Sequence, residues 1–307
     1  MYGSRPFVIS GTCKREKADP HAELIKNVIA ACKKEEAMIG PPLYCVASDG
    51  ESRRGSALTM LTHKRPMSPS SPIFPLLSNL RLMNLFVGDF DLTADKDYKH
   101  VVKRLRNLLL RKMGTLVNGV HITSALLRFH LKENQVSTHR LDYPLNPHDR
   151  QNVPLCYSLL KEVWSLPDPS PSDKPSFVAA RRALQLLGTL FRHIVVPFIQ
   201  INVSLHEQLS HLSAAAHLAT FQVYTVNGAK NKALQSLTFR DIILLVKNAY
   251  FCVAKTKVSS SNSKFWIILL GTDRLESTFD LVRSMVGTDK NADILQLGTR
   301  LSHESCR

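Results

Sequence analysis

Three short stretches of this sequence place acidic or basic residues at spacings that could support chemistry. The first, "VASDG" at 46–50, is an apolar run that ends in Asp49. If this run is a parallel strand of an α/β sheet, Asp49 lies at its carboxyl end, where ligands bind in such sheets. Asp-Gly is also a common turn sequence, so an ordinary turn aspartate is the alternative interpretation.

The second stretch, "DYKHVVKRLRN" at 97–107, reads D-x-x-H-x-x-K-x-x-R-N. As a helix it would bury one apolar stripe, formed by Val101, Val102, Leu105, Leu108 and Leu109. Lys99, Lys103 and Arg106 follow the spacing i, i+4, i+7 and are expected on an exposed face. Such a face fits the phosphate backbone of a nucleic acid. The alternative is a solvated charged face that begins at a capping Asp97.

The third stretch, "GTDRLESTFDLVRSMVG" at 271–287, is predicted to be a helix over 273–286. Asp273 and Glu276 are three residues apart and share one face of it. Leu275, Phe279 and Leu281 are expected to turn toward the core. Its alternative interpretation is a helix with a capped start and ordinary surface charges.

The elements around these stretches change character along the chain. Residues 1–62 predict a β-α-β unit, from the β-like "RPFVISGTC", the amphipathic "DPHAELIKNVIAACKKEEA" and the β-like "PLYCVASDG". The Pro- and Ser-rich "THKRPMSPSSPIFPLL" predicts a loop, and "LRLMNLFVGDFD" predicts another strand. From about residue 97 the pattern is almost wholly helical, with periodic segments near 98–113, 122–132, 151–164, 177–194, 204–223, 236–256 and 273–286, and a linker at 166–176.

Composition limits the class of partner. The 307 residues are 44% hydrophobic, enough for a real core, and 40 Lys and Arg against 25 Asp and Glu give a net charge of +15. That balance favours a polyanion, nucleic acid first. The six cysteines form no C-x-x-C pair. No window reaches the ~18 uninterrupted apolar residues that indicate a membrane span. The sequence therefore predicts a nuclear or cytosolic protein without a membrane partner.

Taken in order, the three motifs resemble the catalytic core of cut-and-paste DNA transposases. The resemblance covers roughly residues 7–300 and is greatest to the P-element/THAP-type group, with hAT enzymes more distant. Wording such as "ASDGESRRG" and "GTDRLESTF" is similar to proteins of fungal mobile elements. The resemblance implies a fold that is α/β plus all-α: a partial ribonuclease-H-like region at 1–112, a helical insertion at 113–270, and a C-terminal helix within 271–307 that completes the core.

The resemblance also implies a D-D-E carboxylate set that binds two Mg²⁺ or Mn²⁺ ions and cleaves and joins DNA strands. Asp49 matches the second catalytic aspartate and Glu276 the final glutamate, so both are expected to be catalytic metal ligands. Asp97, His100 and Asp273 match supporting positions. The expected DNA contacts are Lys99, Lys103, Arg104, Arg106 and Arg111.

One carboxylate of that set has no match in this chain. The family carries its first aspartate on a strand before the first helix, and the run "RPFVISGTC" there holds no acid. Glu16 and Asp19 lie at the helix entry instead. The expectation is a truncated relative of the family that binds DNA in the nucleus but does not cleave it, with homo-oligomers left open. The alternative is a gene prediction that lacks upstream exons.

Three other interpretations remain. A non-catalytic nucleic-acid-binding protein would need only the basic helix, and a helical scaffold would use 150–257 as its platform. Nucleotide binding has little support, because no G-x-x-x-x-G-K-[ST] motif is present. His206, His211 and His217 follow one another at spacings of five and six, which place no two consecutive ones on a single helix face, so no metal site is expected among them.

Overall fold

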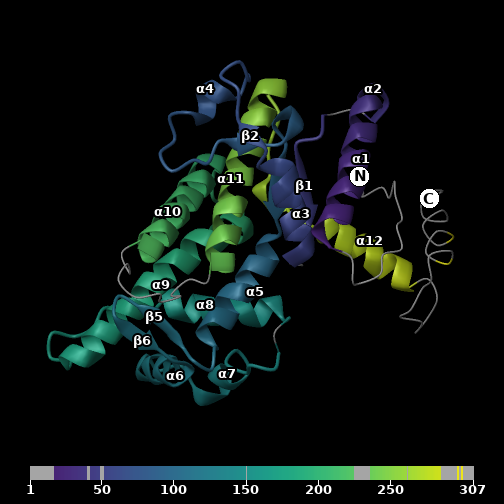
Figure 1. The fold of residues 1–307 in the computed structure, drawn as a ribbon. Helices are drawn as coiled ribbons and strands as arrows, with labels where there is room; N and C mark the ends of the chain where they lie inside the picture. Colours follow the sequence, from purple (N-terminus) through teal and green to yellow (C-terminus); the bar gives the residue numbers. More distant parts are fainter. Residues whose placement is uncertain are drawn as a thin grey trace. The chain divides into compact units, whose positions relative to one another are not determined.

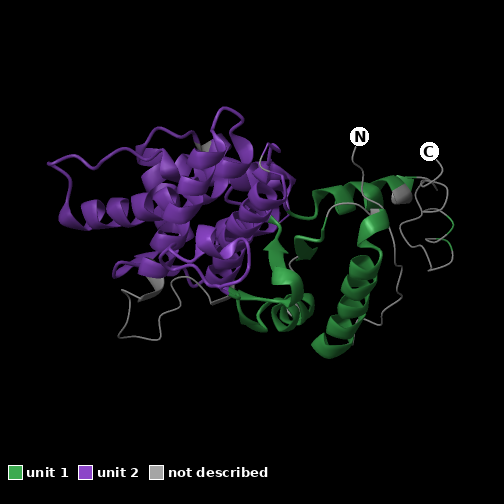
Figure 2. Cartoon of the chain, turned by 90° about the horizontal axis from the view of Figure 1, so that it is seen from above, with its two compact units in different colours: residues 1–68, 86–97, 271–307 green, residues 69–85, 98–270 purple. Residues whose placement is uncertain are grey.

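A computed structural model describes residues 17–39, 42–48, 52–149, 151–224, 236–260 and 262–284, with Gln296 and Thr299. The chain forms two compact units, one of residues 1–68, 86–97 and 271–307, the other of 69–85 and 98–270 (Figure 2). The backbone therefore passes from one unit to the other four times. As a result, Asp97 and Gly271, which flank the long segment 98–270, belong to the same unit.

The first unit contains four described α-helices around short strands (Figure 1). They are α1 (Ala18–Lys34), α2 (Glu36–Ile39), α3 (Ser52–Thr62) and α12 (Asp273–Ser284), and a 3₁₀ turn, η1, covers Asp89–Asp91. Helix α1 carries Asp19 in its first turn and Lys33 and Lys34 in its last, which suits the helix dipole. The predicted amphipathic helix is thus confirmed.

Two small sheets belong to this unit. Strand β1 (Cys45–Ser48) pairs in parallel with β4 (Thr93–Lys96), with Cys45 opposite Thr93 and Ser48 opposite Lys96. Strands β2 (Arg65–Pro66) and β3 (Phe86–Val87) pair antiparallel. Parallel pairing puts the carboxyl ends of β1 and β4 at one edge.

The strand beside β1 differs from the predicted one. The apolar run at 80–91 contributes only Phe86–Val87 to a strand, whereas the partner of β1 is "TADK" at 93–96. All four residues of that strand are buried, including Asp95 and Lys96. Hydrophobic patterning missed it because a buried strand with charged side chains breaks the usual rule. The β-like run at 5–13 lies outside the described residues.

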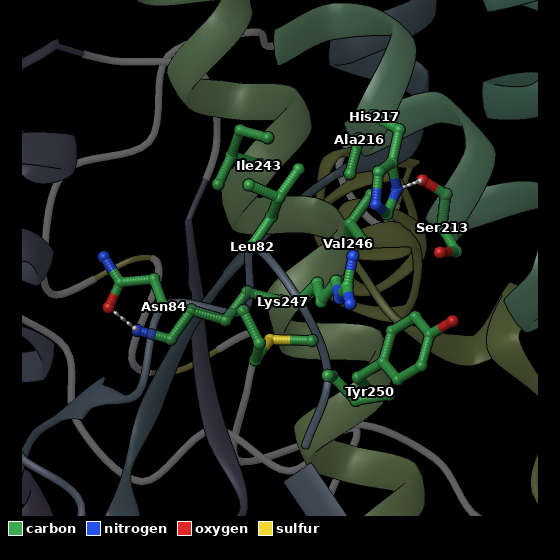
Figure 3. A pocket seen from close by; sticks show the side chains of 12 residues that line it. Leu82, Asn84, Ser213, Ala216, His217, Ile243, Val246, Lys247 and Tyr250 are labelled. Carbon is green, nitrogen blue, oxygen red and sulfur yellow. Dashed lines mark hydrogen bonds between the residues drawn. The ribbon is translucent and has the colours of Figure 1, made fainter. Parts of the chain in front are cut away.

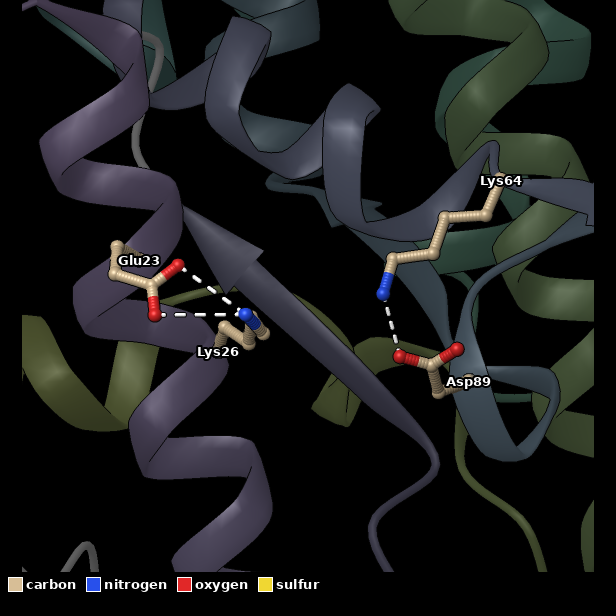
Figure 4. Close-up of polar contacts among 4 residues, drawn as sticks. All are labelled: Glu23, Lys26, Lys64 and Asp89. Carbon is tan, nitrogen blue, oxygen red and sulfur yellow. Dashed lines mark hydrogen bonds and ion pairs between the residues drawn. The ribbon is translucent and has the colours of Figure 1, made fainter.

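A tight approach of backbone to backbone shapes the entry to β4. A Cβ on Gly88 would stand 2.1 Å from the carbonyl oxygen of Leu61, so only glycine fits there. Lys64, just after α3, bonds Asp89 across this turn, and Glu23 and Lys26 pair along α1 (Figure 4). These ion pairs are largely exposed and contribute little to stability.

The second unit is mostly helical. Its elements are α4 (Phe74–Leu77), α5 (Tyr98–Leu109), β5 (Thr115–Val117), β6 (Val120–Ile122), α6 (Ser124–Glu133), α7 (Thr138–Asp142), α8 (Val153–Trp164), α9 (Pro175–Ile199), α10 (Leu205–Tyr224), α11 (Ser236–Ser259) and the 3₁₀ turn η2 (Ile267–Leu269). Helix α9 packs on both α8 and α10, α10 on α11, and α5 on α8 and α11 (Figure 1). Their apolar faces form one continuous core.

The six longer helices of this unit follow the predicted periodic segments closely. The short helix α4, which lies in the predicted loop, was not predicted, and neither were α7 and the hairpin β5–β6. Its two-residue loop is Asn118-Gly119, and both residues have positive φ, 47° and 77°. An Asn-Gly loop between short apolar runs is a strong hairpin signal, and it lay in a region interpreted as helical. The α/β plus helical class is confirmed, while the ribonuclease-H-like sheet stays a prediction.

Helix α9 is also the one described helix that is long and apolar enough to cross a membrane. More than half of its most apolar window is buried inside the unit, against α8 and α10. That burial is typical of the central helix of a core.

Candidate functional site

Two aspartates of the first unit hold the start of α12. The Asp95 carboxylate accepts a 2.6 Å hydrogen bond from the Gly271 N–H and a 2.9 Å bond from the Lys96 N–H. Asp97 Oδ2 accepts from both the N–H and the hydroxyl of Thr272, at 3.1 and 2.6 Å. Both aspartates are 1% exposed. Segments that lie about 175 residues apart in sequence are thereby joined by charge-assisted hydrogen bonds.

Gly271 makes this junction possible. Its φ is +106°, a conformation that L side chains rarely adopt. A Cβ there would meet Asp97 Oδ2 at 3.3 Å, tighter than an ordinary contact. The backbone at Gly271 therefore passes directly against the Asp97 carboxylate, which accepts hydrogen bonds from the next residue, Thr272.

Glu276 lies one turn into α12, at the predicted catalytic position. Its side chain is exposed, and Oε1 lies 3.5 Å from the Thr272 hydroxyl that also bonds Asp97. Its N–H bonds the Thr272 carbonyl oxygen at 2.9 Å. Asp273, the predicted supporting acid, is half-buried in the same turn. Asp97 and Glu276 are therefore linked through Thr272, an arrangement that positions an exposed carboxylate at a helix N-terminus.

The other face of α12 corrects a prediction. Leu275, Phe279 and Leu281 were expected to turn toward the core, but they are 49%, 41% and 46% exposed. The buried side chains in this region include Thr272, just before the first residue of α12, and Thr278 within the helix. The apolar positions misled the prediction because the anchoring of α12 comes from polar groups of β4, which periodicity does not detect.

The predicted partner of Glu276 cannot be placed. Asp49 lies outside the described residues, so its convergence with Glu276 remains a prediction. The strand that precedes it, β1, ends at Ser48, opposite Lys96 of β4. Within the described ranges, no three His, Cys, Asp or Glu side chains come together as metal ligands.

The basic helix α5, in the second unit, confirms one half of its prediction. Its buried side chains include the whole predicted stripe: Val101, Val102, Leu105, Leu108 and Leu109. Arg106, however, is not on an exposed face; it is 0% exposed. Its guanidinium donates to three backbone carbonyl oxygens, those of Pro144, Asn146 and Asp149. The planar guanidinium therefore donates its hydrogen bonds to a loop of the protein and not to water.

The remaining cations of α5 are only partly available to a ligand. Arg104 is paired with the buried Asp241 of α11. Lys103 donates to Gln151 at 3.1 Å in an exposed contact, and burial lowers the pKa of the half-buried Arg111. Lys99 and His100 are half-buried in the first turn. Of the five cations predicted to contact DNA, Arg104 and Arg106 thus have partners within the protein, and DNA contact by any of the five stays a prediction.

A small hollow in the second unit lies between the loop 80–84 and helices α10 and α11 (Figure 3). Its volume is about 90 Å³, and the buried Lys247 reaches along it to Asn84, with Nζ 3.5 Å from Oδ1. Burial, reinforced by the nearby Lys255, lowers the pKa of Lys247 to about 8. Pockets for cofactor-sized ligands measure ~300–1,000 Å³, so this hollow lends no support to nucleotide binding.

Sequence reasoning missed Asp95 and Thr272. A signal for Asp95 was present, because Asp95 and Asp97 are two residues apart, the spacing of one face of a strand. The run around them was not recognised as a strand. The N–H and hydroxyl of Thr272 both donate to Asp97, a long-range contact that the capped helix start expected from the sequence does not indicate.

Comparison with known proteins gives one structural match. No protein-family model and no curated protein matches this sequence. Among solved structures, a chain of the Drosophila P element transposase strand transfer complex is similar, with a TM-score of 0.58 and 15% identity. The match covers 94% of this chain and 64% of that chain. Over nearly its whole length, the protein therefore has a transposase-like fold, and it spans about two thirds of the similar chain.

Proposed function

We propose that this protein derives from a DNA transposase of the P-element/THAP type and binds DNA in the nucleus. The observation that carries the proposal is the anchoring of α12: Asp95 and Asp97 of the β4 segment bind the turn from which Glu276 projects. The likeness to the P element transposase chain supports it independently. A helix that returns to a sheet after a long insertion, bearing an acid, is what the three sequence motifs predicted.

In the proposed site, Asp49 and Glu276 are the metal-binding carboxylates of a ribonuclease-H-like core. Mg²⁺ or Mn²⁺, held by such a set, would activate water or a 3′-hydroxyl and stabilise the leaving oxygen of a phosphodiester. Carboxylate oxygens suit both ions. Asp97 acts as a positioning residue, because its hydrogen bonds fix Thr272 and so the first turn of α12.

We propose that the 307 residues of this sequence do not cleave DNA strands by themselves. The run "RPFVISGTC" before α1 holds no acid to act as the first aspartate of the D-D-E set. Two carboxylates leave a bridging position of a two-metal site unfilled. DNA binding does not require that site, because it rests on contacts between cations and phosphates.

The DNA surface that we propose is the exposed part of α5 and the turn after it, with Lys99, Lys103 and Arg111 as its members. Arg104 and Arg106 are set aside, since an acid and three carbonyl oxygens of the second unit occupy them. Phosphate contacts of this kind position a protein on a duplex but read no sequence. Binding is therefore expected to be weak and nonspecific.

The test combines two assays on the full chain. Radiolabelled duplex DNA with Mg²⁺ or Mn²⁺ should remain uncut and unjoined, while fluorescence anisotropy should detect duplex binding that weakens steeply with salt. Metal-dependent cleavage that Asp49→Ala or Glu276→Gln abolishes would contradict the loss of activity and support an active enzyme. Matched variants at Asp142 and Glu162, which pair with Arg128 and Arg140, control for general loss of charge.

One observation favours a second candidate, a helical scaffold without DNA. The two most strongly held arginines of α5 stabilise its own unit, so the positive charge of this helix serves packing at least in part. The absence of any salt-sensitive duplex binding would favour the scaffold and leave the net charge as a solubility feature. Homo-oligomers are compatible with either candidate.

A further inference from the structure

Two histidines of neighbouring helices meet in the second unit. His193 on α9 and His211 on α10 place their Nδ1 atoms 2.8 Å apart, and their ring centroids 4.8 Å apart. Both side chains are half-buried. Along α10 alone, His206, His211 and His217 have the wrong spacing for a shared metal. The partner of His211 comes from another helix, which spacing along one helix could not reveal.

Both imidazoles are available in their neutral form. Burial lowers the pKa of His193 first, and the charges of His211 and Arg192 lower it further. Burial and Arg192 lower the pKa of His211, while Glu207 acts in the opposite direction. At neutral pH the pair therefore shares one N–H···N hydrogen bond, with a donor on one ring and a lone pair on the other. Neutral imidazole is also the form that binds metals.

The distance between the two nitrogens sets the geometry of any ion between them. With metal–nitrogen bonds of ~2.0–2.1 Å, a separation of 2.8 Å corresponds to an N–metal–N angle of about 86°. Tetrahedral Zn²⁺ would need the nitrogens ~3.3 Å apart. Adjacent positions of a square-planar or tetragonal ion are ~90° apart, the preference of Cu²⁺ and Ni²⁺.

We propose that His193 and His211 form a two-histidine site for a tetragonal divalent transition metal, Ni²⁺ or Cu²⁺, which links α9 to α10. The ring that carries its proton on Nδ1 moves it to Nε2 through solvent, and both rings turn so that the two Nδ1 lone pairs face the ion. No proton is lost from the neutral pair. Water fills the other coordination positions.

The charges around the pair define how strong the site can be. Arg192 precedes His193 on α9 and opposes a cation, while Glu207 lies one turn before His211 on α10 and offsets it. The Glu207 carboxylate stays bonded to the N–H and hydroxyl of Ser204, at 2.9 and 2.7 Å, and is not a ligand. His206 is the remaining titratable neighbour of that carboxylate. We therefore expect moderate affinity that weakens as pH falls and the imidazoles protonate.

The site is tested with metal alone on the full chain. Ni²⁺ should raise the midpoint of thermal unfolding by about 2 °C for each tenfold excess over its dissociation constant, because the ion binds only where both helices are in place. Mg²⁺, which prefers oxygen ligands, should not produce this rise. The electron paramagnetic resonance spectrum of bound Cu²⁺ should show two coupled nitrogens.

The variants His193→Gln and His211→Gln keep a polar side chain in the contact but remove one imidazole each. Each should lose the Ni²⁺-dependent rise and one coupled nitrogen, whereas the exposed His217→Ala on the same helix should retain both. A rise that survives in both glutamine variants would assign the effect to other histidines and overturn the site. If a variant unfolds, the wild-type nitrogen count alone decides: fewer than two overturns it. Neither result depends on DNA binding or cleavage.

Discussion

The start of α12 and the basic helix α5 use their charged side chains in different ways. At α12, Asp95 and Asp97 are buried, and their partners are N–H and hydroxyl groups of the turn that carries the exposed Glu276. On α5, the buried Arg106 donates to carbonyl oxygens of the loop 144–149. None of these partners belongs to a residue predicted to bind a ligand. One set of internal bonds positions a candidate functional residue, and the other only completes a fold.

This difference shows when a charged motif can be interpreted as a site. In both regions the buried charges are hydrogen-bonded to groups of the protein, as burial requires. What distinguishes α12 is that the buried charges orient a further charged residue that remains exposed. Arg106 orients a loop, and the other cations with a known partner are held outside the helix, Arg104 by Asp241 of α11 and Lys103 by Gln151. Mutations that separate stability from ligand binding can break or sharpen this comparison.

The largest expected effect is at Arg106. Arg106→Ala removes the donors of three carbonyl oxygens and leaves a cavity, so we expect the free energy of unfolding to fall by about 4 kcal/mol. Urea denaturation of the purified chain measures it. Lys103→Ala, in an exposed contact on the same helix, should change it by less than about 0.5 kcal/mol. Equal effects of the two substitutions would show that the buried fork is not the stabilising contact.

The next effect concerns pH and a second buried arginine in the same unit. Arg181 donates to His130 Nδ1 at 3.1 Å, and burial, followed by the charge of Arg181, lowers the pKa of His130 to about 4. The unfolded chain, with a pKa near 6.5, then binds the proton more readily. The stability that comes from a neutral His130 is therefore complete above pH 6.5 and is lost as pH falls toward 4.

By this linkage the free energy of unfolding should fall by about 3 kcal/mol between pH 7 and pH 4 on account of His130. His193 and His211 titrate in the same direction. Denaturation curves at stepped pH measure the loss, and His130→Gln should flatten the dependence in this window. An unchanged slope in that variant would assign the acid sensitivity to other groups.

A smaller effect is expected at the anchor of α12. Asp97→Ala leaves the Thr272 N–H and hydroxyl without their acceptor and should lower the free energy of unfolding by about 2 kcal/mol. Amide hydrogen exchange at Thr272 should accelerate with it. Thr272→Val removes the hydroxyl bond but keeps the N–H bond, so its effect should be smaller. Slow exchange at Thr272 in Asp97→Ala would contradict the anchoring role.

The sequence predicted most helices and missed two sheet features, for physical reasons. The helices of the second unit repeat apolar residues with a regular period and bury that face, as α5 does with Val101 and Leu105. Strand β4 buries Asp95 and Lys96 instead, and only tertiary partners make that burial tolerable. The hairpin at Asn118 was detectable from its turn residues.

The candidate site shows the same limit. Glu276, Asp97 and the basic helix were found from residue types and spacing, because acids and cations at helical intervals are visible in one dimension. The partners of Asp97 and Arg106 were not, since Thr272 and the loop at 144–149 lie far along the chain. The same reason hid the contact of His193 with His211. Contacts between residues far apart in the sequence determine which charged side chains stay exposed, and local sequence patterns do not reveal those contacts.

The smallest effect separates the surface cations of α5 from its buried ones. If Lys99 and Lys103 contact phosphates, replacing both by glutamine should reduce the slope of log K against log salt by about two. The loss of affinity between 50 and 200 mM salt should then be roughly tenfold smaller than in the wild-type chain. Stability should hardly change, because both side chains are only half-buried. Anisotropy titrations at several salt concentrations, with Arg128→Gln and Lys161→Gln together as a charge-matched control, measure it. If the control pair reduces the slope equally, net charge alone accounts for the DNA binding. Helix α5 would then present no residue for a ligand, whereas α12 presents Glu276.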